Sequence, residues 1–135
     1  MVRVVPDTNI WVASIQWRGR PYRIRKLGEE GTVDLVTSLP ILAELTRVLR
    51  EYFGMPDDET YEWYQRIGVC SEIVHPTRRL NVVPDDPDDD KFVECAIEGH
   101  ADYIISRDGD LLRLKQYERV RIVDDDGFLR VVQEH

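Results

Sequence analysis

The sequence predicts an α/β fold with a mostly parallel central sheet, and three observations support this prediction. Short runs rich in β-branched residues alternate with longer segments in which apolar residues recur every three or four positions. Strands that alternate with helices in this way are typical of a parallel sheet covered by helices. The chain has 135 residues and no visible internal repeat, which is enough for one domain with a substantial core. We therefore expect residues 1–135 to form a single domain.

The first strand is expected at Val2–Val5, where a β-branched run ends just before the acidic residue Asp7. A helix should follow over Ile10–Gln16, with Asp7 or Thr8 as its cap. Glycine and proline at positions 19–21 break the chain. A second helix is then expected over Tyr22–Glu30, ending near a glycine.

The second strand is expected at Thr32–Thr37, where apolar and polar residues alternate. The next helix should begin with Ser38 as its cap, and it carries an apolar stripe at positions 42, 45, 48 and 49. Glu44 lies in the early turns of this helix, off the densest part of the stripe. A further helix is predicted over Glu59–Ile67.

The second half of the chain begins with two short extended pieces, SEIVHP and LNVVP, within residues 69–83. A helix should open at Asp88–Asp90, with its buried side formed by apolar residues at positions 92, 93, 96 and 97. The remaining elements are a strand at Tyr103–Ser106, a short helix at Leu111–Leu114 and a final strand at Val120–Val123.

Composition excludes several classes of protein. No stretch approaches the roughly 18 apolar residues that suggest a membrane span, and the first ten residues lack the apolar core of a signal peptide. Cys70 and Cys95 have neither CxxC nor Cys/His spacing, so we expect no disulfide framework and no zinc site. These features predict a reduced, cytoplasmic protein with no membrane partner.

The formal net charge of -8 argues against a protein that coats nucleic acid without regard to sequence, because phosphate contacts need Lys and Arg. A local basic rim is still compatible with this charge. The densest basic segment is interleaved with Trp17 and Tyr22 and contains Arg18, Arg20, Arg23, Arg25 and Lys26. Such a segment can contact RNA phosphates and stack on bases, or it can be a solvated helix face with aromatics packed inward.

Carboxylates from four separate segments are expected to meet at one edge of the sheet. In an open parallel sheet, active sites form outside the carboxyl ends of the strands. Asp7 follows the first strand, while Asp108 and Asp110 follow the strand at 103–106. Glu44 lies early in the helix after the second strand, and Asp89 lies at a helix start that should face the same edge.

Clustered carboxylates are costly unless a positive group holds them, and a divalent metal is the obvious candidate. Oxygen ligands suit Mg²⁺ or Mn²⁺ rather than zinc. Such a site can activate water and neutralise charge on a phosphodiester, so we infer phosphodiester hydrolysis. Taken singly, Asp7 and Asp108 could be ordinary helix caps, and Glu44 could be a solvated residue. Only their joint placement favours a metal site.

Four segments also carry a resemblance to a known family: the first strand with Asp7-Thr8-Asn9, Glu44, DPDDDKFVECA and ADYIISRDGDLL. In these segments the chain resembles the PIN-domain ribonucleases, and among them the small prokaryotic VapC-like toxins of toxin–antitoxin pairs. The resemblance implies a three-layer α/β/α sandwich. It also implies an endoribonuclease that depends on Mg²⁺ or Mn²⁺ and hydrolyses RNA.

The resemblance further implies a set of site residues. The family's acidic quartet would map onto Asp7, Glu44, Asp89 and Asp108. Asn9 and Ser106 would support these acids or a bound water. Asp110 would be a fifth carboxylate, although its spacing also fits a helix cap. Asp90 is the alternative to Asp89, because the two point about 100° apart on a helix and only one can readily face the metal.

The partners implied by the resemblance are an RNA substrate, a small antitoxin that covers the acidic cleft, and a second copy of the chain in a homodimer. The aromatic segment Tyr52–Ile67 is where a dimer surface would lie, unless Trp63 and Tyr64 pack in the core.

Two other functions compete with the nuclease. A response-regulator-like receiver would need a lysine near the end of the last strand, and Lys115 lies in a helical stretch instead. A catalytically silent domain that binds RNA or protein would have no reason to keep four clustered carboxylates.

Overall fold

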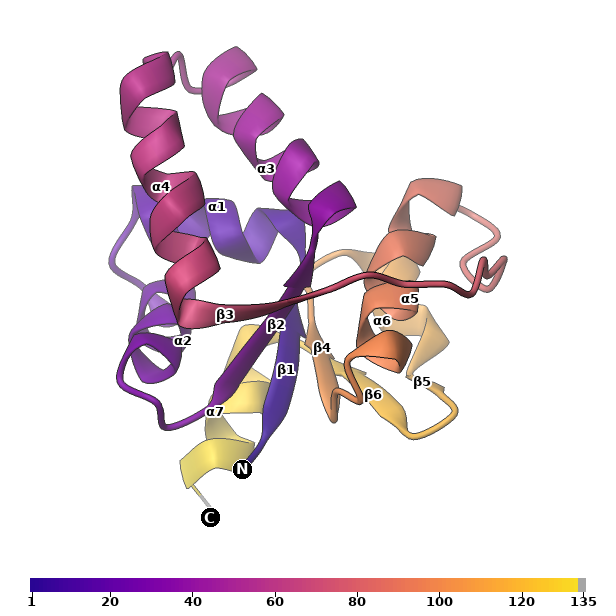
Figure 1. Ribbon diagram of the computed structural model, residues 1–135. Helices are drawn as coiled ribbons and strands as arrows, with labels where there is room; N and C mark the ends of the chain where they lie inside the picture. Colours follow the sequence, from indigo (N-terminus) through magenta and orange to yellow (C-terminus); the bar gives the residue numbers. More distant parts are fainter. Residues whose placement is uncertain (134–135) are drawn as a thin grey trace.

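The computed structural model describes residues 1–133 and contains a six-stranded sheet in the order β3-β2-β1-β4-β6-β5 (Figure 1). Every neighbouring pair is parallel except β5 with β6. The strands are β1 (Arg3–Pro6), β2 (Asp34–Ser38), β3 (Ser71–Val74), β4 (Tyr103–Ile105), β5 (Gln116–Tyr117) and β6 (Val120–Val123). This order differs from that of flavodoxin-like receivers, in which the third strand lies beside the first.

Helices cover both faces of the sheet. In Figure 1, α1, α2 and α7 lie on one side of the sheet and α5 and α6 on the other, while α3 and α4 form a hairpin that projects beyond the strands. The predicted α/β fold with a three-layer arrangement is therefore confirmed. The helices are α1 (Thr8–Gln16), α2 (Arg20–Glu29), α3 (Leu39–Glu51), α4 (Asp57–Cys70), the 3₁₀ helix η1 (Pro87–Asp89), α5 (Asp90–Glu98), α6 (Gly109–Leu114) and α7 (Asp125–Gln133).

The central strands are buried on both faces, which is why they consist of almost continuous apolar runs. Val4, Val5 and Ile104 are completely inaccessible to solvent. The carboxyl ends of β1 and β4 are adjacent, because the backbone N–H of Asp7 donates to the carbonyl of Ile105 at 2.9 Å. This pairing places the residues that follow the two strands next to each other.

Several local predictions differ from the structure. The piece SEIV forms β3, but LNVVP lies in a loop and pairs with no strand of the described chain. Ser38 occupies the position before α3 without making a side-chain capping hydrogen bond. Strand β5 and helix α7 were not predicted. The capping residue Asp124, whose Oδ1 accepts the N–H of Gly127 at 2.7 Å, was the available signal for α7.

The loop between β3 and η1 is held by three carboxylates that follow each other at four-residue spacing along α5. Asp90 Oδ1 accepts the N–H groups of Val82 and Val83 at 2.9 and 3.0 Å. Glu94 Oε2 accepts the N–H of Leu80 at 2.8 Å. Glu98 Oε1 accepts the N–H of Thr77 at 3.0 Å. Charge-assisted hydrogen bonds therefore replace a strand ladder for this loop.

Candidate active site

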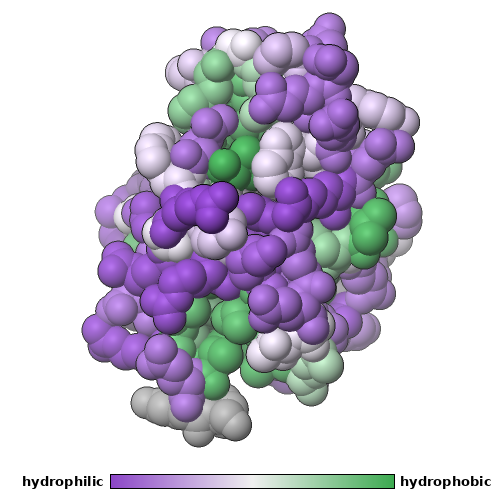
Figure 2. Space-filling model, turned by 90° about the vertical axis from the view of Figure 1, so that its left-hand side faces the viewer, coloured by the Kyte–Doolittle hydropathy of each residue, from purple (hydrophilic) through white to green (hydrophobic). Residues whose placement is uncertain are grey.

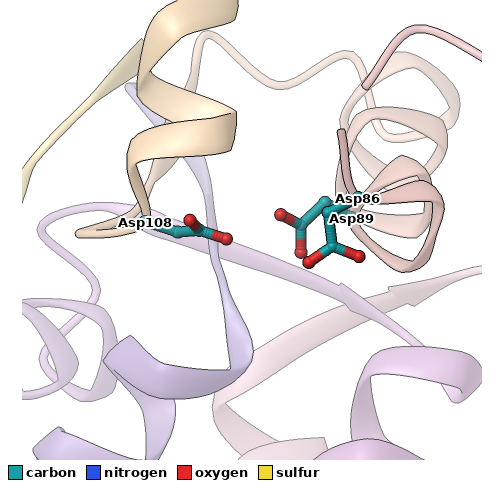
Figure 3. Close-up of side chains that lie close together, drawn as sticks. All are labelled: Asp86, Asp89 and Asp108. Atoms are coloured by element: carbon teal, nitrogen blue, oxygen red, sulfur yellow. The ribbon is translucent and has the colours of Figure 1, made fainter. Parts of the chain in front are cut away.

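Three carboxylates from two segments converge beyond the carboxyl ends of the strands. One oxygen each of Asp86, Asp89 and Asp108 lies within 4.8 Å of the others. Figure 3 shows Asp86 and Asp89 extending from the segment at the start of α5, opposite Asp108 from the loop before α6. Asp86 belongs to the acidic run but was not predicted as a site residue. The available signal was its position before Pro87, where it caps η1 through the N–H of Asp88 at 3.2 Å.

Asp7 and Glu44 line the same cavity as Asp89 and Asp108, and this cavity has a volume of about 670 Å³. The four predicted acids thus share one concave surface, as the strand-end argument required. They come from the end of β1, from α3, from the start of α5 and from the loop after β4. The structure adds Asp86 and Asp88 to this acidic wall.

Two of the acids are also helix caps, and the capping bonds fix their orientation. Asp7 Oδ1 accepts the N–H of Ile10 at 2.8 Å, and Asp108 Oδ1 accepts the N–H of Asp110 at 3.1 Å. The hydroxyl of Ser106 accepts the N–H of Asp108 at 2.9 Å. Each cap uses one carboxylate oxygen, so capping and metal binding are compatible roles for the same side chain.

Burial makes these acids hard to ionise without a cation. It raises the pKa of Asp7 to about 6, with hydrogen bonds from Ser106 and Ile10 opposing the rise and the charge of Asp108 adding to it. Burial and the neighbouring Asp108 raise the pKa of Asp89 to about 8. Among residues 1–133, the buried Oδ2 of Asp89 has no hydrogen-bond partner. A buried oxygen left unpaired within an all-carboxylate group fits a hard divalent cation.

Glu44 is held by two neighbours that sequence analysis did not assign to the site. It accepts a hydrogen bond from the hydroxyl of Thr8, and its Oε2 lies 3.1 Å from Lys91 Nζ. The same ammonium group donates to the carbonyl of Asp88 at 2.7 Å. Lys91 therefore neutralises part of the acidic wall and fixes Glu44 against it.

Comparison with known proteins agrees with this arrangement. The profile described as "PIN domain" matches residues 3–110 of the chain. The chain belongs to the PIN-domain family. PIN domains are typically nucleases that bind divalent metal ions through acidic residues, and this PIN domain carries such an acidic group. No curated protein matches the sequence significantly.

A solved structure supports the fold of this PIN domain. The structure described as "Crystal structure of PAE2754 from Pyrobaculum aerophilum" matches with a TM-score of 0.64 and 10% sequence identity. The match covers 100% of this chain and 91% of that chain. At this identity the likeness concerns the fold alone. Within residues 1–133 of the PIN domain, every helix is too short or too polar to serve as a membrane span.

The predicted supporting residues of the PIN domain are not all brought to the cavity. Asn9 is exposed and lines it. Asp90 turns away, because its Oδ1 is engaged by the loop amides described above. Asp110 does not line the cavity either, and its carboxylate accepts a hydrogen bond from Arg113. The placement thus favours Asp89 over Asp90 as the helix-start acid, and it does not favour Asp110 as a fifth carboxylate.

The predicted basic rim is also placed differently, because none of its five side chains lines the acidic cavity. Arg25 is only 4% exposed, and its guanidinium donates to the carbonyl of Ser14 at 3.2 Å and pairs with Glu29 at 3.0 Å. Lys26 lies 3.4 Å from the same Glu29. Arg18 and Arg25 lie over the ring of Tyr22 at 5.2 and 5.3 Å. The rim prediction is therefore wrong for Arg25, whose guanidinium stabilises the packing of α1 and α2.

Two other arginines line the cavity instead, Arg47 from α3 and Arg107 from the loop after β4. Arg107 Nη2 pairs with the buried Asp125 Oδ2 at 2.6 Å, and Arg20 Nε reaches the same oxygen at 2.9 Å. Hydrogen bonds from Arg107, chiefly, and from Arg20 lower the pKa of Asp125 to about 2, against the effect of burial. This cluster ties the N-terminus of α7 to the rim of the cavity.

Proposed function

We propose that this PIN domain is an endoribonuclease that uses Mg²⁺ or Mn²⁺ to hydrolyse phosphodiester bonds of RNA at the acidic cavity. The observation that carries the proposal is the convergence of carboxylates from separate elements around Asp89, whose Oδ2 has no hydrogen-bond partner within residues 1–133. Without a cation, such an arrangement only costs stability. A metal-binding function explains why the fold keeps it.

The residues of the cavity have different roles, which follow from where they lie. Asp86, Asp89 and Asp108 are close enough together to hold one ion. A divalent ion bound there neutralises charge on the phosphodiester and activates a water. Asp7 and Glu44 line the rest of the wall, where they can complete the set of ligands or orient the water. Ser106 fixes the loop of Asp108, and Lys91 fixes Glu44.

A first experiment tests the reaction and the acids together. Purified protein is incubated with an unstructured and a structured RNA in Mg²⁺, Mn²⁺ or EDTA. We expect cleavage in Mg²⁺ or Mn²⁺, none in EDTA, and a loss of at least about a hundredfold for Asp108→Asn. Asp85→Asn is the matched control, because Asp85 belongs to the acidic run but is exposed and pairs with Arg113 at 3.6 Å. Binding of RNA without metal dependence and without cleavage would support the adaptor alternative instead.

We further propose that the protein is the toxin of a toxin–antitoxin pair that acts in the cytoplasm. The support is the family likeness and the open acidic cavity, which an antitoxin could cover with a basic side chain. Induced expression in a bacterium should arrest growth, and Asp108→Asn should relieve the arrest. Growth arrest of the same size with the variant would refute a toxic role for the cavity.

The proposed homodimer would use the exposed side of the α3–α4 hairpin. Tyr61 and Tyr64 are exposed and stack on each other with ring centroids 6.4 Å apart. Trp63 is half-buried between the guanidinium groups of Arg25 and Arg66, at 4.9 and 4.8 Å, so it belongs to the fold rather than to a surface. On the face shown in Figure 2, hydrophilic residues predominate and hydrophobic ones show only in separate patches. Comparing the sedimentation of the Tyr61→Ala variant with that of wild type tests this surface, because a variant that no longer forms the dimer sediments more slowly.

A further inference from the structure

The end of the acidic cavity farthest along α3 is lined by aromatic side chains that are open to solvent. Trp17, Tyr52 and Phe53 line it and are 59%, 78% and 42% exposed. Trp17 follows α1, and the other two follow α3. The rings of Trp17 and Phe53 meet edge to face, with centroids 6.1 Å apart and planes at 76°. In this geometry the two rings are not stacked face to face, so the ring whose edge makes the contact keeps both of its faces free of the other.

Exposed aromatic rings of this size call for an explanation, because burying them is one of the main sources of stability in proteins. The core does not lack room for aromatics, since Trp11 and Phe128 are almost fully buried. Trp17 and Phe53 instead contact each other, exposed to solvent, in a cavity that the acids also line. Flat, accessible rings beside a polar site are typical of surfaces that bind unpaired bases.

Helix α3 connects the two ends of the cavity and carries a cation between them. Glu44 lines the acidic end, Arg47 follows one turn later, and Tyr52 lies at the aromatic end. Eight residues of helix separate the first from the last, which is about 12 Å along the axis. Arg47 pairs with Glu51 at 3.4 Å, and both side chains are more than half exposed. Such a surface pair contributes little, so the guanidinium is free to exchange its carboxylate for a phosphate.

We propose that Trp17, Tyr52 and Phe53 form a stacking subsite for unpaired bases of an RNA strand, with Arg47 contacting a phosphate between this subsite and the metal-binding acids. The inference rests on the proposed nuclease function and specifies its substrate as single-stranded RNA. Bases in a duplex have both faces covered by their neighbours and cannot stack on these rings. A protein segment is favoured less, because the cavity combines aromatic rings, two arginines and a carboxylate wall that a divalent ion would convert into a phosphate site.

The first test measures binding without hydrolysis. Asp108→Asn protein in Mg²⁺ is titrated with an unpaired RNA of about ten nucleotides and with a duplex of the same sequence. Trp17 is the exposed tryptophan, since Trp11 is buried and Trp63 is half-buried, so quenching of tryptophan fluorescence reports on this subsite. We expect the unpaired strand to quench the fluorescence and the duplex to leave it nearly unchanged. Equal quenching by both would overturn the proposal.

Further substitutions in the Asp108→Asn protein show which side chains contribute to the affinity for RNA. Trp17→Ala and Tyr52→Ala should each weaken binding of the unpaired strand about tenfold, measured by fluorescence anisotropy of labelled RNA, because one base loses its stacking partner. Trp17→Phe should restore most of the affinity, since it keeps a ring. Val69→Ala is the control, because Val69 is an exposed apolar residue that does not line the cavity. An affinity unchanged by Trp17→Ala would refute the subsite and leave a protein partner as the occupant of these rings.

Cleavage assays separate failure of this inference from failure of the proposed function. If wild type cleaves single-stranded RNA and Trp17→Ala does so with the same kcat/KM, the nuclease stands and the stacking subsite is refuted. If wild type cleaves nothing but Trp17→Ala loses affinity for the unpaired strand, the subsite stands and the nuclease is refuted. Thermal unfolding of each variant checks that the fold is intact.

Discussion

The substitution Asp7→Asn should make the metal-free protein more stable while removing its proposed activity. Asp7 is buried at the end of β1, and its pKa is raised to about 6, chiefly by burial. An amide at this position carries no charge and retains an oxygen that can accept the N–H of Ile10, so the cap of α1 is preserved. The variant therefore removes the cost of a buried charge and little else.

The magnitude follows from the shift in pKa. The pKa of Asp7 rises from 3.8 to about 6 on folding, which corresponds to a cost of about 3 kcal/mol once the carboxyl is ionised. Because the folded pKa lies above the unfolded one, this cost is absent below pH 3.8. It grows as the pH rises through 6 and is complete at pH 7 and above. For a chain of this length, 3 kcal/mol corresponds to a rise in Tm of about 10 °C at most.

The assay is thermal and urea unfolding of wild type and Asp7→Asn in EDTA between pH 4 and pH 8. The variant should be the more stable protein at pH 7.5, and the difference should disappear towards pH 4. Asp85→Asn serves as the control, because Asp85 is exposed and should show no such dependence. Adding Mg²⁺ should stabilise wild type more than the variant. An Asp7→Asn protein that is no more stable than wild type at pH 7.5 would refute the electrostatic account of the site.

Three further predictions concern charged side chains around the cavity. Lys91→Gln should tighten Mg²⁺ binding severalfold in calorimetric titrations, because the ammonium 3.1 Å from Glu44 no longer competes with the ion; weaker binding would contradict this role. Asp90→Ala should lower the free energy of unfolding in urea by about 2 to 4 kcal/mol, because two backbone N–H groups of the loop lose their acceptor. Hydrogen exchange at those two amides should accelerate, and unchanged exchange would argue against the contact. Asp125→Asn should cost about 2 kcal/mol at pH 7, because Arg107 holds the pKa of Asp125 near 2. Since that folded pKa is lowered, the cost should shrink as the pH falls from 4 towards 2, and a difference that does not depend on pH would contradict the ion pair.

The parts of the site that depend on strand ends could be predicted from the sequence. Asp7 directly follows β1 and Asp108 lies in the loop just after β4, and parallel strands bring their carboxyl ends to one edge whatever their order in the sheet. The positions of Glu44 and Asp89 were predicted from the same rule, because the helices that carry them begin at this edge of the sheet. The predicted fold class was confirmed for the same reason, because alternating strands and helices leave few other arrangements.

The parts that depend on tertiary partners could not be predicted. Arg25 has the same local context as its exposed neighbours, and only the packing of α1 against α2 buries it. Lys91 looks like a solvated residue until α3 brings Glu44 beside it. The apolar alternation of LNVVP is typical of a strand, but β3 ends the sheet and the backbone N–H groups of this loop bond to carboxylates of α5 instead. Long-range contacts decide each of these cases.

The pairing of β1 with β4 has a consequence for how the protein is made. Asp7 and Ile105, whose carbonyl accepts the backbone N–H of Asp7, lie about a hundred residues apart in the sequence. During synthesis Asp7 and Asp108 therefore remain apart until β4 and the loop after it have emerged, and closing so long a loop is a slow step. Truncated chains that stop before β4 lack Asp108 and cannot assemble the acidic cavity. If the protein is toxic, its own topology delays the appearance of activity until β4 and the loop that carries Asp108 have been translated.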